Sequence, residues 1–177
     1  MKTPKILLIL FLFVLNSCSS DIESPGVITT QYAMTAKIDD ALWEMNNPLN
    51  TNTATKPLFD YYPTKEYIQL VGRKNVIDEI RLYIKRTNLK IGTYPITAAT
   101  FDASKTQIET SFNSKAKSQY PVEGSLSITA IDLKAKTVAG TFSFNCVENY
   151  LKPISATNPV TTKVTEGTFN YKYDVAN

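Results

Sequence analysis

One stretch of alternating apolar and polar residues, from Gly124 to Cys146, constrains the fold of this chain more than any other feature. Apolar side chains occupy every second position before and after a short polar connection at 132–136. Successive side chains of a strand point to opposite faces, so a two-residue period is typical of a strand with one buried face. We therefore predict an antiparallel hairpin. The residues expected to share its buried face are Leu126, Ile128, Ala130, Val138, Gly140, Phe142, Phe144 and Cys146.

Shorter runs with the same period predict further strands on both sides of this hairpin. Asp39-Asp40 separates the first two runs and predicts a two-residue turn, although Asp-Asp favours positive φ less than Asp-Gly does. Pro95 cannot donate a ladder hydrogen bond, so its run is expected to be an edge strand or a strand start. Residues 46–66 are rich in Asn, Thr and Pro and are expected to form a long loop. The other predicted strands are 32–38, 42–45, 67–73, 79–86, 93–96, 106–112 and 163–173.

The spacing of these runs indicates the fold class. After the N-terminal segment, no stretch sustains the i, i+3, i+4 apolar spacing of an amphipathic helix. Short strands separated by turn residues favour an all-β antiparallel fold, either a sandwich or a barrel. We predict the β-sandwich, with a β-barrel as the alternative.

The N-terminal segment has the pattern of an export signal that ends at a lipidated cysteine. Lys2 and Lys5 precede an apolar run from Ile6 to Leu15, about half the ~20 residues needed to span a bilayer. Leu15-Asn16-Ser17-Cys18 is similar to the bacterial lipoprotein lipobox, Leu-x-(Gly/Ala/Ser)-Cys. We therefore predict a signal peptide over 1–17, lipidation at Cys18 with a spacer to residue 30, and a single β domain over 31–177. An ordinary signal peptide with a coincidental cysteine is the alternative.

Lipidation at Cys18 implies an address in the cell envelope. Two or more acyl chains, such as palmitate, anchor a protein stably where one chain does so marginally. Serine follows the cysteine, which by enterobacterial sorting logic favours the outer membrane. The acidic and polar residues 19–23 loosely resemble a surface-export tag of Bacteroidota lipoproteins. The prediction is an outer-membrane, lipid-anchored protein, with the cell-surface and periplasmic sides both left open.

Charge and cysteine content exclude several classes of protein. Removal of the 17 signal residues with their two lysines leaves 160 residues with 17 basic and 16 acidic side chains. This balanced charge, without a block of like charges, argues against nucleic acid as a partner. With Cys18 lipidated, Cys146 has no disulfide partner, so stability must come from a packed core.

Short motifs in the predicted strands resemble a known family. In chain order they are Ala36-Lys37-Ile38-Asp39-Asp40 with Trp43, Gly92-Thr93-Tyr94, Gly124 to Thr129, Gly140-Thr141-Phe142-Ser143-Phe144 and Thr165-Glu166-Gly167-Thr168-Phe169. The chain resembles uncharacterised all-β lipoproteins of Bacteroidota over most of residues 32–170. That family usually has glycine where this chain has Asp40. The resemblance implies a lipoprotein with an all-β fold and brings no catalytic residues with it.

The residue types available for catalysis are few. The sequence contains no histidine, which removes the commonest general base and zinc ligand. Cys146 is expected to face the core as a small apolar side chain. The carboxylates include Asp39, Asp40 and the pair Asp78-Glu79, but no spacing selects a glycosidase pair and no calcium-loop motif is present. We predict no enzyme, no metal site and no cofactor.

Aromatic residues on and beside the predicted long loop offer a binding surface. Trp43, Tyr61, Tyr62 and Tyr67 are the candidate ligand-binding residues, because exposed rings stack on sugars or anchor protein partners. The alternative is that Trp43 belongs to the core and the tyrosines cover it. The favoured function is a non-enzymatic binding or accessory module for glycan or protein. A structural subunit of an envelope assembly is the second hypothesis, a carbohydrate-active hydrolase the third, and the oligomeric state is left open.

Overall fold

The computed structural model describes residues 33–45, 65–74, 78–97, 102 and 104–173. These residues form nine strands and one short 3-10 turn, η2 (Arg86–Asn88), with no α-helix among them. The predicted signal peptide, Cys18 and the spacer lie outside the described residues. The strands are β1 (Met34–Ile38), β2 (Ala41–Met45), β3 (Tyr67–Lys74), β4 (Asp78–Lys85), β5 (Gly92–Ile96), β6 (Gln107–Ser111), β7 (Tyr120–Asp132), β8 (Thr137–Val147) and β9 (Val160–Lys172).

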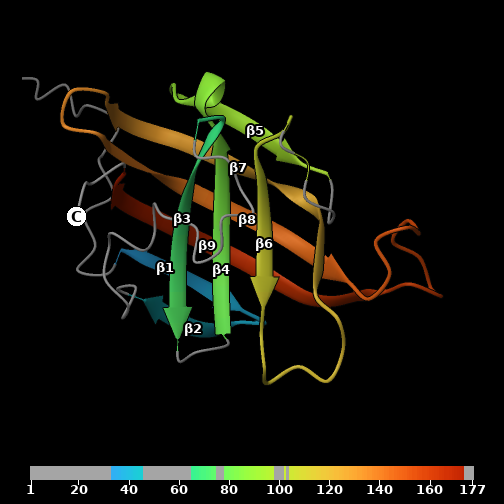
Figure 1. Cartoon of the computed structure of the whole chain (residues 1–177). Coiled ribbons are helices and arrows are strands. Elements are labelled where there is room, and N and C mark those ends of the chain that lie inside the picture. The colour runs from blue at the N-terminus through green and yellow to red at the C-terminus, as the bar shows by residue number, and fades with distance from the viewer. Residues whose placement is uncertain (1–32, 46–64, 75–77, 98–101, 103, 174–177) are drawn as a thin grey trace, which may run out of the picture.

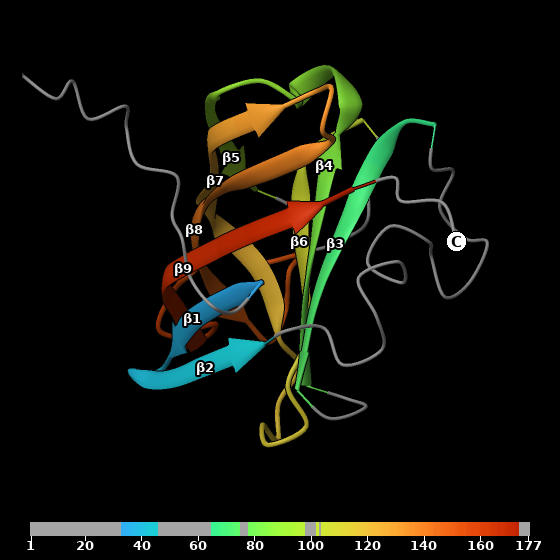
Figure 2. The same ribbon diagram turned by 90° about the vertical axis from the view of Figure 1, so that its left-hand side faces the viewer.

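Two antiparallel sheets pack face to face, which confirms the predicted sandwich over the barrel (Figures 1 and 2). The larger sheet has the order β2-β1-β9-β8-β7-β5, and the smaller has the order β3-β4-β6. Strands of the smaller sheet cross over those of the larger one rather than running along them (Figure 1). The edge position predicted for the Pro95 run is confirmed, since β5 ends the larger sheet; β6 ends the smaller.

The β7–β8 hairpin forms as its alternation predicts and lies in the larger sheet between β9 and the edge strand β5. The connection is stabilised by Asp132, whose Oδ1 accepts hydrogen bonds from the backbone N–H groups of Lys134 and Ala135, both at 2.8 Å. Such side-chain turns are a known use of aspartate between strands. The paired region is longer than predicted, because β7 begins at Tyr120 and β8 extends to Val147. The expected inner face is buried at every β8 position and at Leu126 and Ile128 of β7, whereas Ala130, which follows a register shift in the β7–β8 pairing, is only half-buried.

Two Gly-Thr-Phe motifs lie side by side in β8 and β9. The antiparallel register pairs Gly140 with Phe169, Thr141 with Thr168, and Phe142 with Gly167. Each glycine therefore faces a phenylalanine of the other strand. A Cβ atom built on Gly140 would lie 2.6 Å from Phe169 Cζ and 2.0 Å from the Ser127 carbonyl oxygen. The motifs identified in the sequence thus serve packing, since the absence of a side chain makes room for each ring.

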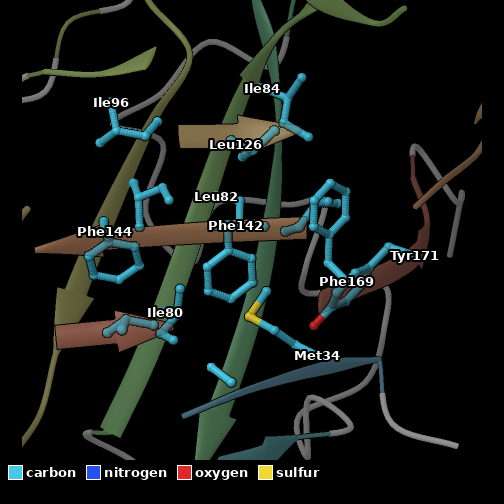
Figure 3. Packing of buried hydrophobic residues seen from close by; sticks show 14 of the residues in the cluster. Met34, Ile80, Leu82, Ile84, Ile96, Leu126, Phe142, Phe144, Phe169 and Tyr171 are labelled. Atoms are coloured by element: carbon cyan, nitrogen blue, oxygen red, sulfur yellow. The ribbon is translucent and has the colours of Figure 1, made fainter. Parts of the chain in front are cut away.

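The core lies between the two sheets (Figure 3). Phe142, Phe169 and Met34 of the larger sheet face Ile80 and Leu82 of β4, all almost fully buried. Full burial of such a side chain contributes about 1.5–3 kcal/mol. A hydrogen bond of 2.9 Å from Tyr171 Oη to the carbonyl oxygen of Val71 also joins the sheets.

The outer face of the smaller sheet carries a buried ionic cluster. Arg73 Nη2 lies 2.6 Å from Glu79 Oε2, and Arg81 Nε lies 2.5 Å from Glu79 Oε1. Arg73 and Glu79 are cross-strand partners in β3 and β4, and both are buried. Tyr83 on the same face is fully buried, and its hydroxyl donates to Glu109 at 2.9 Å. Burial, supported by the charge of Glu109, raises the pKa of Tyr83 far above its usual value.

Candidate functional site

A pocket of about 340 Å³ opens at one end of the sandwich, where the β1–β2 hairpin meets the smaller sheet. We call it the Trp43 pocket. Apolar side chains from β1, β2 and the residue after β6 provide much of its lining, and two lysines and two aspartates are the charged members. The lining residues are Ile38, Asp39, Ala41, Leu42, Trp43, Lys74, Asp78, Phe112, Ser114 and Lys115. A volume in this range suits one small ligand or one inserted side chain.

The hairpin turn beside the pocket adopts the tight two-residue form that the sequence predicts. Asp39 and Asp40 have φ values of 47° and 67°, and Ile38 pairs directly with Ala41. Positive φ at both central residues is the signature of a type I′ turn. Aspartate tolerates this region better than most residues. The turn is therefore tight without a glycine at either central position.

Asp39 joins the hairpin to two other segments. Its backbone N–H donates to the Lys163 carbonyl oxygen at 2.9 Å, and its Oδ1 accepts from the Lys163 backbone N–H at 2.7 Å. Its other carboxylate oxygen forms an ion pair with Lys115 Nζ. Burial favours the neutral acid, but the hydrogen bonds from Lys115 and from the Lys163 backbone outweigh it, so the pKa of Asp39 lies below its usual value. Asp39 is thus held ionised as a structural partner.

Asp78 is the second carboxylate of the pocket. Its Oδ1 accepts a hydrogen bond of 2.6 Å from the backbone N–H of Asn113, which ties β4 to the segment after β6. Two carboxylates in one hollow are the arrangement that a glycosidase requires, but one of them must be a general acid with a raised pKa. Asp39 has the opposite shift. Asp39 therefore lacks the pKa shift of a general acid and stands as a fixed charge in the pocket wall.

Trp43 forms part of the pocket wall while belonging to the core. Its side chain packs against Gly72 of β3, where an added Cβ would lie 2.8 Å from Trp43 Cη2. The indole Nε1 is buried and has no hydrogen-bond partner among the described residues. A buried donor without a partner costs about 1–3 kcal/mol. An acceptor group on a bound ligand is one way to satisfy such a donor.

Of the four predicted aromatic residues, the structure describes Trp43 and Tyr67 and does not bring these two together. Trp43 is 4% exposed and Tyr67 is 2% exposed, so neither presents an open ring face, and the core alternative describes Trp43 correctly. Trp43 packs on the inner face of the smaller sheet, whereas Tyr67 packs edge-on against Tyr83 of the outer face, with ring centroids 5.5 Å apart. Tyr61 and Tyr62 lie outside the described residues. Their ligand binding stays a prediction.

Sequence reasoning missed Lys115 and Phe112. They follow β6 and reach the pocket only because the smaller sheet crosses the β1–β2 hairpin. Lys115 is 76 residues away from Asp39 in the sequence, so no local pattern predicts that the two side chains pair. Cys146, in contrast, is fully buried as predicted, and desolvation raises the pKa of its thiol to about 12, against a smaller opposing contribution from Thr110.

Comparison with known proteins adds one assignment. Residues 30–172 match a family described as a domain of unknown function, DUF6252. The chain belongs to this family. A search of curated proteins found no match, nor did a search of solved structures.

The DUF6252 range contains all nine strands, the Trp43 pocket and both Gly-Thr-Phe motifs. Cys18 precedes that range, so the family assignment leaves lipidation as a prediction. Within the described part of the chain, no three His, Cys, Asp or Glu side chains are grouped to hold a metal ion. None of the helical segments described is long and apolar enough to cross a membrane. The function of this DUF6252 member must therefore be argued from its own surface.

Proposed function

We propose that this protein is a lipid-anchored binding module of the bacterial outer membrane that recognises a protein ligand at the Trp43 pocket. The observation that carries the binding role is the pocket itself, an apolar hollow bordered by charges fixed in place. The anchor rests on the lipobox ending at Cys18 and on the resemblance to lipoproteins of Bacteroidota. The proposal covers both the cell-surface and the periplasmic side of that membrane.

The pocket combines features that favour binding. Leu42 is 65% exposed beside it, while Phe112 and Trp43 are buried in its wall. Exposed apolar surface next to an apolar hollow is a feature of protein contact sites. Asp39 and Lys115 are held by each other and by the type I′ turn, so little order must be created on binding. A partner therefore meets a preformed surface.

A protein ligand fits these residues better than a glycan. Sugar recognition by stacking needs an exposed ring face. Trp43 and Tyr67 present none, whereas Leu42 offers an aliphatic contact suited to a protein side chain. Glycan binding through Tyr61 and Tyr62 is the competing version. It predicts that a glycan array shows a ligand whose binding is lost on Tyr61→Ala or Tyr62→Ala.

The hydrolase hypothesis is testable because Asp39 and Asp78 share one pocket. It predicts glycoside hydrolysis that Asp39→Asn and Asp78→Asn each abolish. If the protein is a binding module, it should hydrolyse no glycoside. The Asp78→Asn variant, which removes one negative charge, should then keep both its fold and its partner.

Photocrosslinking in intact cells tests the binding proposal. Benzoylphenylalanine at position 42 should yield a defined protein adduct, and the same group at the equally exposed Leu133, in the β7–β8 connection, should not. Ser114 lines the pocket and is exposed, so Ser114→Tyr should fill the hollow and remove the adduct. Ser118→Tyr, exposed outside the lining, is the matched control. An adduct that is the same from both positions, or that survives Ser114→Tyr, contradicts the proposal.

Metabolic labelling tests the anchor separately. An alkyne-tagged fatty acid should label the wild-type protein, and Cys18→Ala should abolish the label and release the protein from membranes. Cys146 is fully buried, so it offers no second acylation site in the folded domain. Unchanged labelling of Cys18→Ala would refute the assignment.

A further inference from the structure

The loop that joins β8 to β9, residues 148–159, exposes an unusual amount of apolar surface. We call it the tip loop. Leu151 is 78% exposed, and Tyr150 and Ile154 are also exposed. These three are half of the six large apolar side chains exposed in the described residues. The loop projects from one end of the larger sheet (Figure 1). Clustered apolar exposure of this kind marks contact surfaces.

The tip loop is ordered by one buried side chain. Asn158 is 3% exposed, and its Nδ2 donates to the carbonyl oxygens of Asn149 and Lys152 at 2.9 Å and of Pro153 at 3.3 Å. Its Oδ1 accepts from the Asn149 backbone N–H at 3.2 Å. Compact loops closed by their own side chains in this way are frequently functional. The apolar residues are therefore presented on a preformed frame.

A hollow of about 520 Å³ lies between the tip loop and β7. Val122 and Glu123 of β7 line it together with Lys152, Pro153 and Ile154 of the loop. Glu123 and Lys152 place one negative and one positive charge in the same small area. Leu151 is not among the lining residues and is the most exposed large apolar side chain described. The patch thus offers a projecting leucine, an apolar hollow and two opposite charges.

We propose that the tip loop is a self-association site, at which two copies of this chain pack loop to loop. A twofold arrangement lets Leu151 of each copy enter the other's hollow and places Lys152 of each copy opposite Glu123 of the other. A surface that pairs with itself must carry both partners of every contact, and this patch does. One loop per copy makes a small interface, which belongs to the weak and transient class.

The position of the loop favours a second copy over a membrane as its partner. The tip loop precedes Val160, whereas Met34, where the described chain enters the sheet, pairs with Phe169. The nine residue steps from Val160 to Phe169 in β9 correspond to roughly 30 Å at ~3.3 Å per residue. Glu148 is paired with Lys117, and Glu123 shares the hollow with Lys152, so these side chains give the patch no excess positive charge to attract an anionic lipid surface.

Crosslinking of the full chain in cells and sedimentation of the chain from residue 18, with Cys18→Ser, test the proposal together. Benzoylphenylalanine at position 151 should give a product of twice the chain mass, and at position 133 it should not. Between about 10 μM and about 1 mM the purified chain should shift from monomer to dimer. Leu151→Asp should abolish the shift, whereas Leu133→Asp should leave it.

A charge swap separates direct pairing from loss of apolar contact. Lys152→Glu and Glu123→Lys should each weaken dimerisation about tenfold or more, and the double variant should restore it, because the pair is re-formed across the interface. Circular dichroism checks that each variant keeps its fold. A chain that stays monomeric throughout overturns the proposal, as does equal loss in Leu133→Asp. Leu151-dependent binding to phosphatidylethanolamine–phosphatidylglycerol vesicles without a dimer also overturns it and assigns the loop to lipid.

Discussion

Replacing Asn158 by aspartate should open the tip loop while leaving the sandwich folded. The change is isosteric but removes the amide donor that serves three carbonyl oxygens. A hydrogen bond contributes about 0.5–1.5 kcal/mol net, so three of them amount to about 2–4 kcal/mol. Apart from Asn149 and Asn158, the residues of the loop are exposed, so its carbonyl groups regain water when it opens. The loss should therefore appear as local opening.

Amide hydrogen exchange measures this opening directly. The N–H groups of Asn149, Leu151 and Ser155 are hydrogen-bonded inside the loop and should exchange roughly 100-fold faster in Asn158→Asp, since 1.4 kcal/mol corresponds to a factor of ten. Amides at the centre of β8 should be unchanged. Asn170→Asp, the same chemical change on half-buried Asn170 in β9, is the control and should alter neither set.

The acid dependence of the variant gives a second check. The new carboxyl would be buried among carbonyl oxygens, which raises its pKa, and its protonated form regains one donor. The loop is then more stable below the ordinary aspartate pKa of about 4 and loses that stability as the pH rises through the raised value. Unchanged exchange in the variant at neutral pH, or cooperative unfolding of the whole domain, would refute the account of Asn158 as a local frame.

Three further perturbations probe the sandwich. Glu79→Gln leaves Arg73 and Arg81 without their shared charge and should cost about 3–5 kcal/mol in urea unfolding; a loss below ~1 kcal/mol would mean that the cluster is not buried as described. Gly140→Ala forces a methyl group against Phe169 and the Ser127 carbonyl and should lower the free energy of unfolding by about 1–3 kcal/mol or more. The control Ser143→Ala, on the exposed face, should change it by no more than ~0.5 kcal/mol. Equal effects of the two changes would contradict the packing role of the two Gly-Thr-Phe motifs. Because the pKa of Asp39 is lowered in the folded state, its contribution to stability is present above the unfolded value of about 4 and is lost as the pH falls through the folded value. Asp39→Asn should remove that part of the acid dependence of the unfolding midpoint, and an identical pH profile would show that the carboxylate is not engaged.

The strands could be predicted because their signal is local. Alternation marks the buried face of β8 residue by residue, and the structure buries Val138, Phe142, Phe144 and Cys146 as expected. The Asp39-Asp40 turn was also predictable, since two turn-capable residues between alternating runs leave little choice of geometry. Pro95 likewise marks an edge strand through a missing donor.

The pocket could not be predicted because it depends on how the sheets cross. Trp43 and Tyr67 are both aromatic residues beside the predicted long loop, yet they pack on opposite faces of the smaller sheet. Alternation also predicts that Arg81 and Tyr83 lie on the strand face opposite the core. It does not predict that this second face is buried as well. The partnership of Asp39 with Lys115 has no periodic signature, because it joins a hairpin turn to the segment after β6.

The Trp43 pocket and the tip loop share one end of the larger sheet and one supporting segment. Asp39 is bonded to Lys163, four residues beyond the tip loop, and Lys115 of the pocket belongs to the segment that leads to Gln119. The Gln119 side chain in turn accepts hydrogen bonds from Thr161 and Thr162 at the start of β9. Asp39 and Gln119 are thus the two residues through which a displacement of Lys115 would reach the base of the tip loop. If both surfaces bind as proposed, filling the pocket with Ser114→Tyr should leave tip-loop dimerisation intact, whereas a pocket ligand that displaces Lys115 should change it.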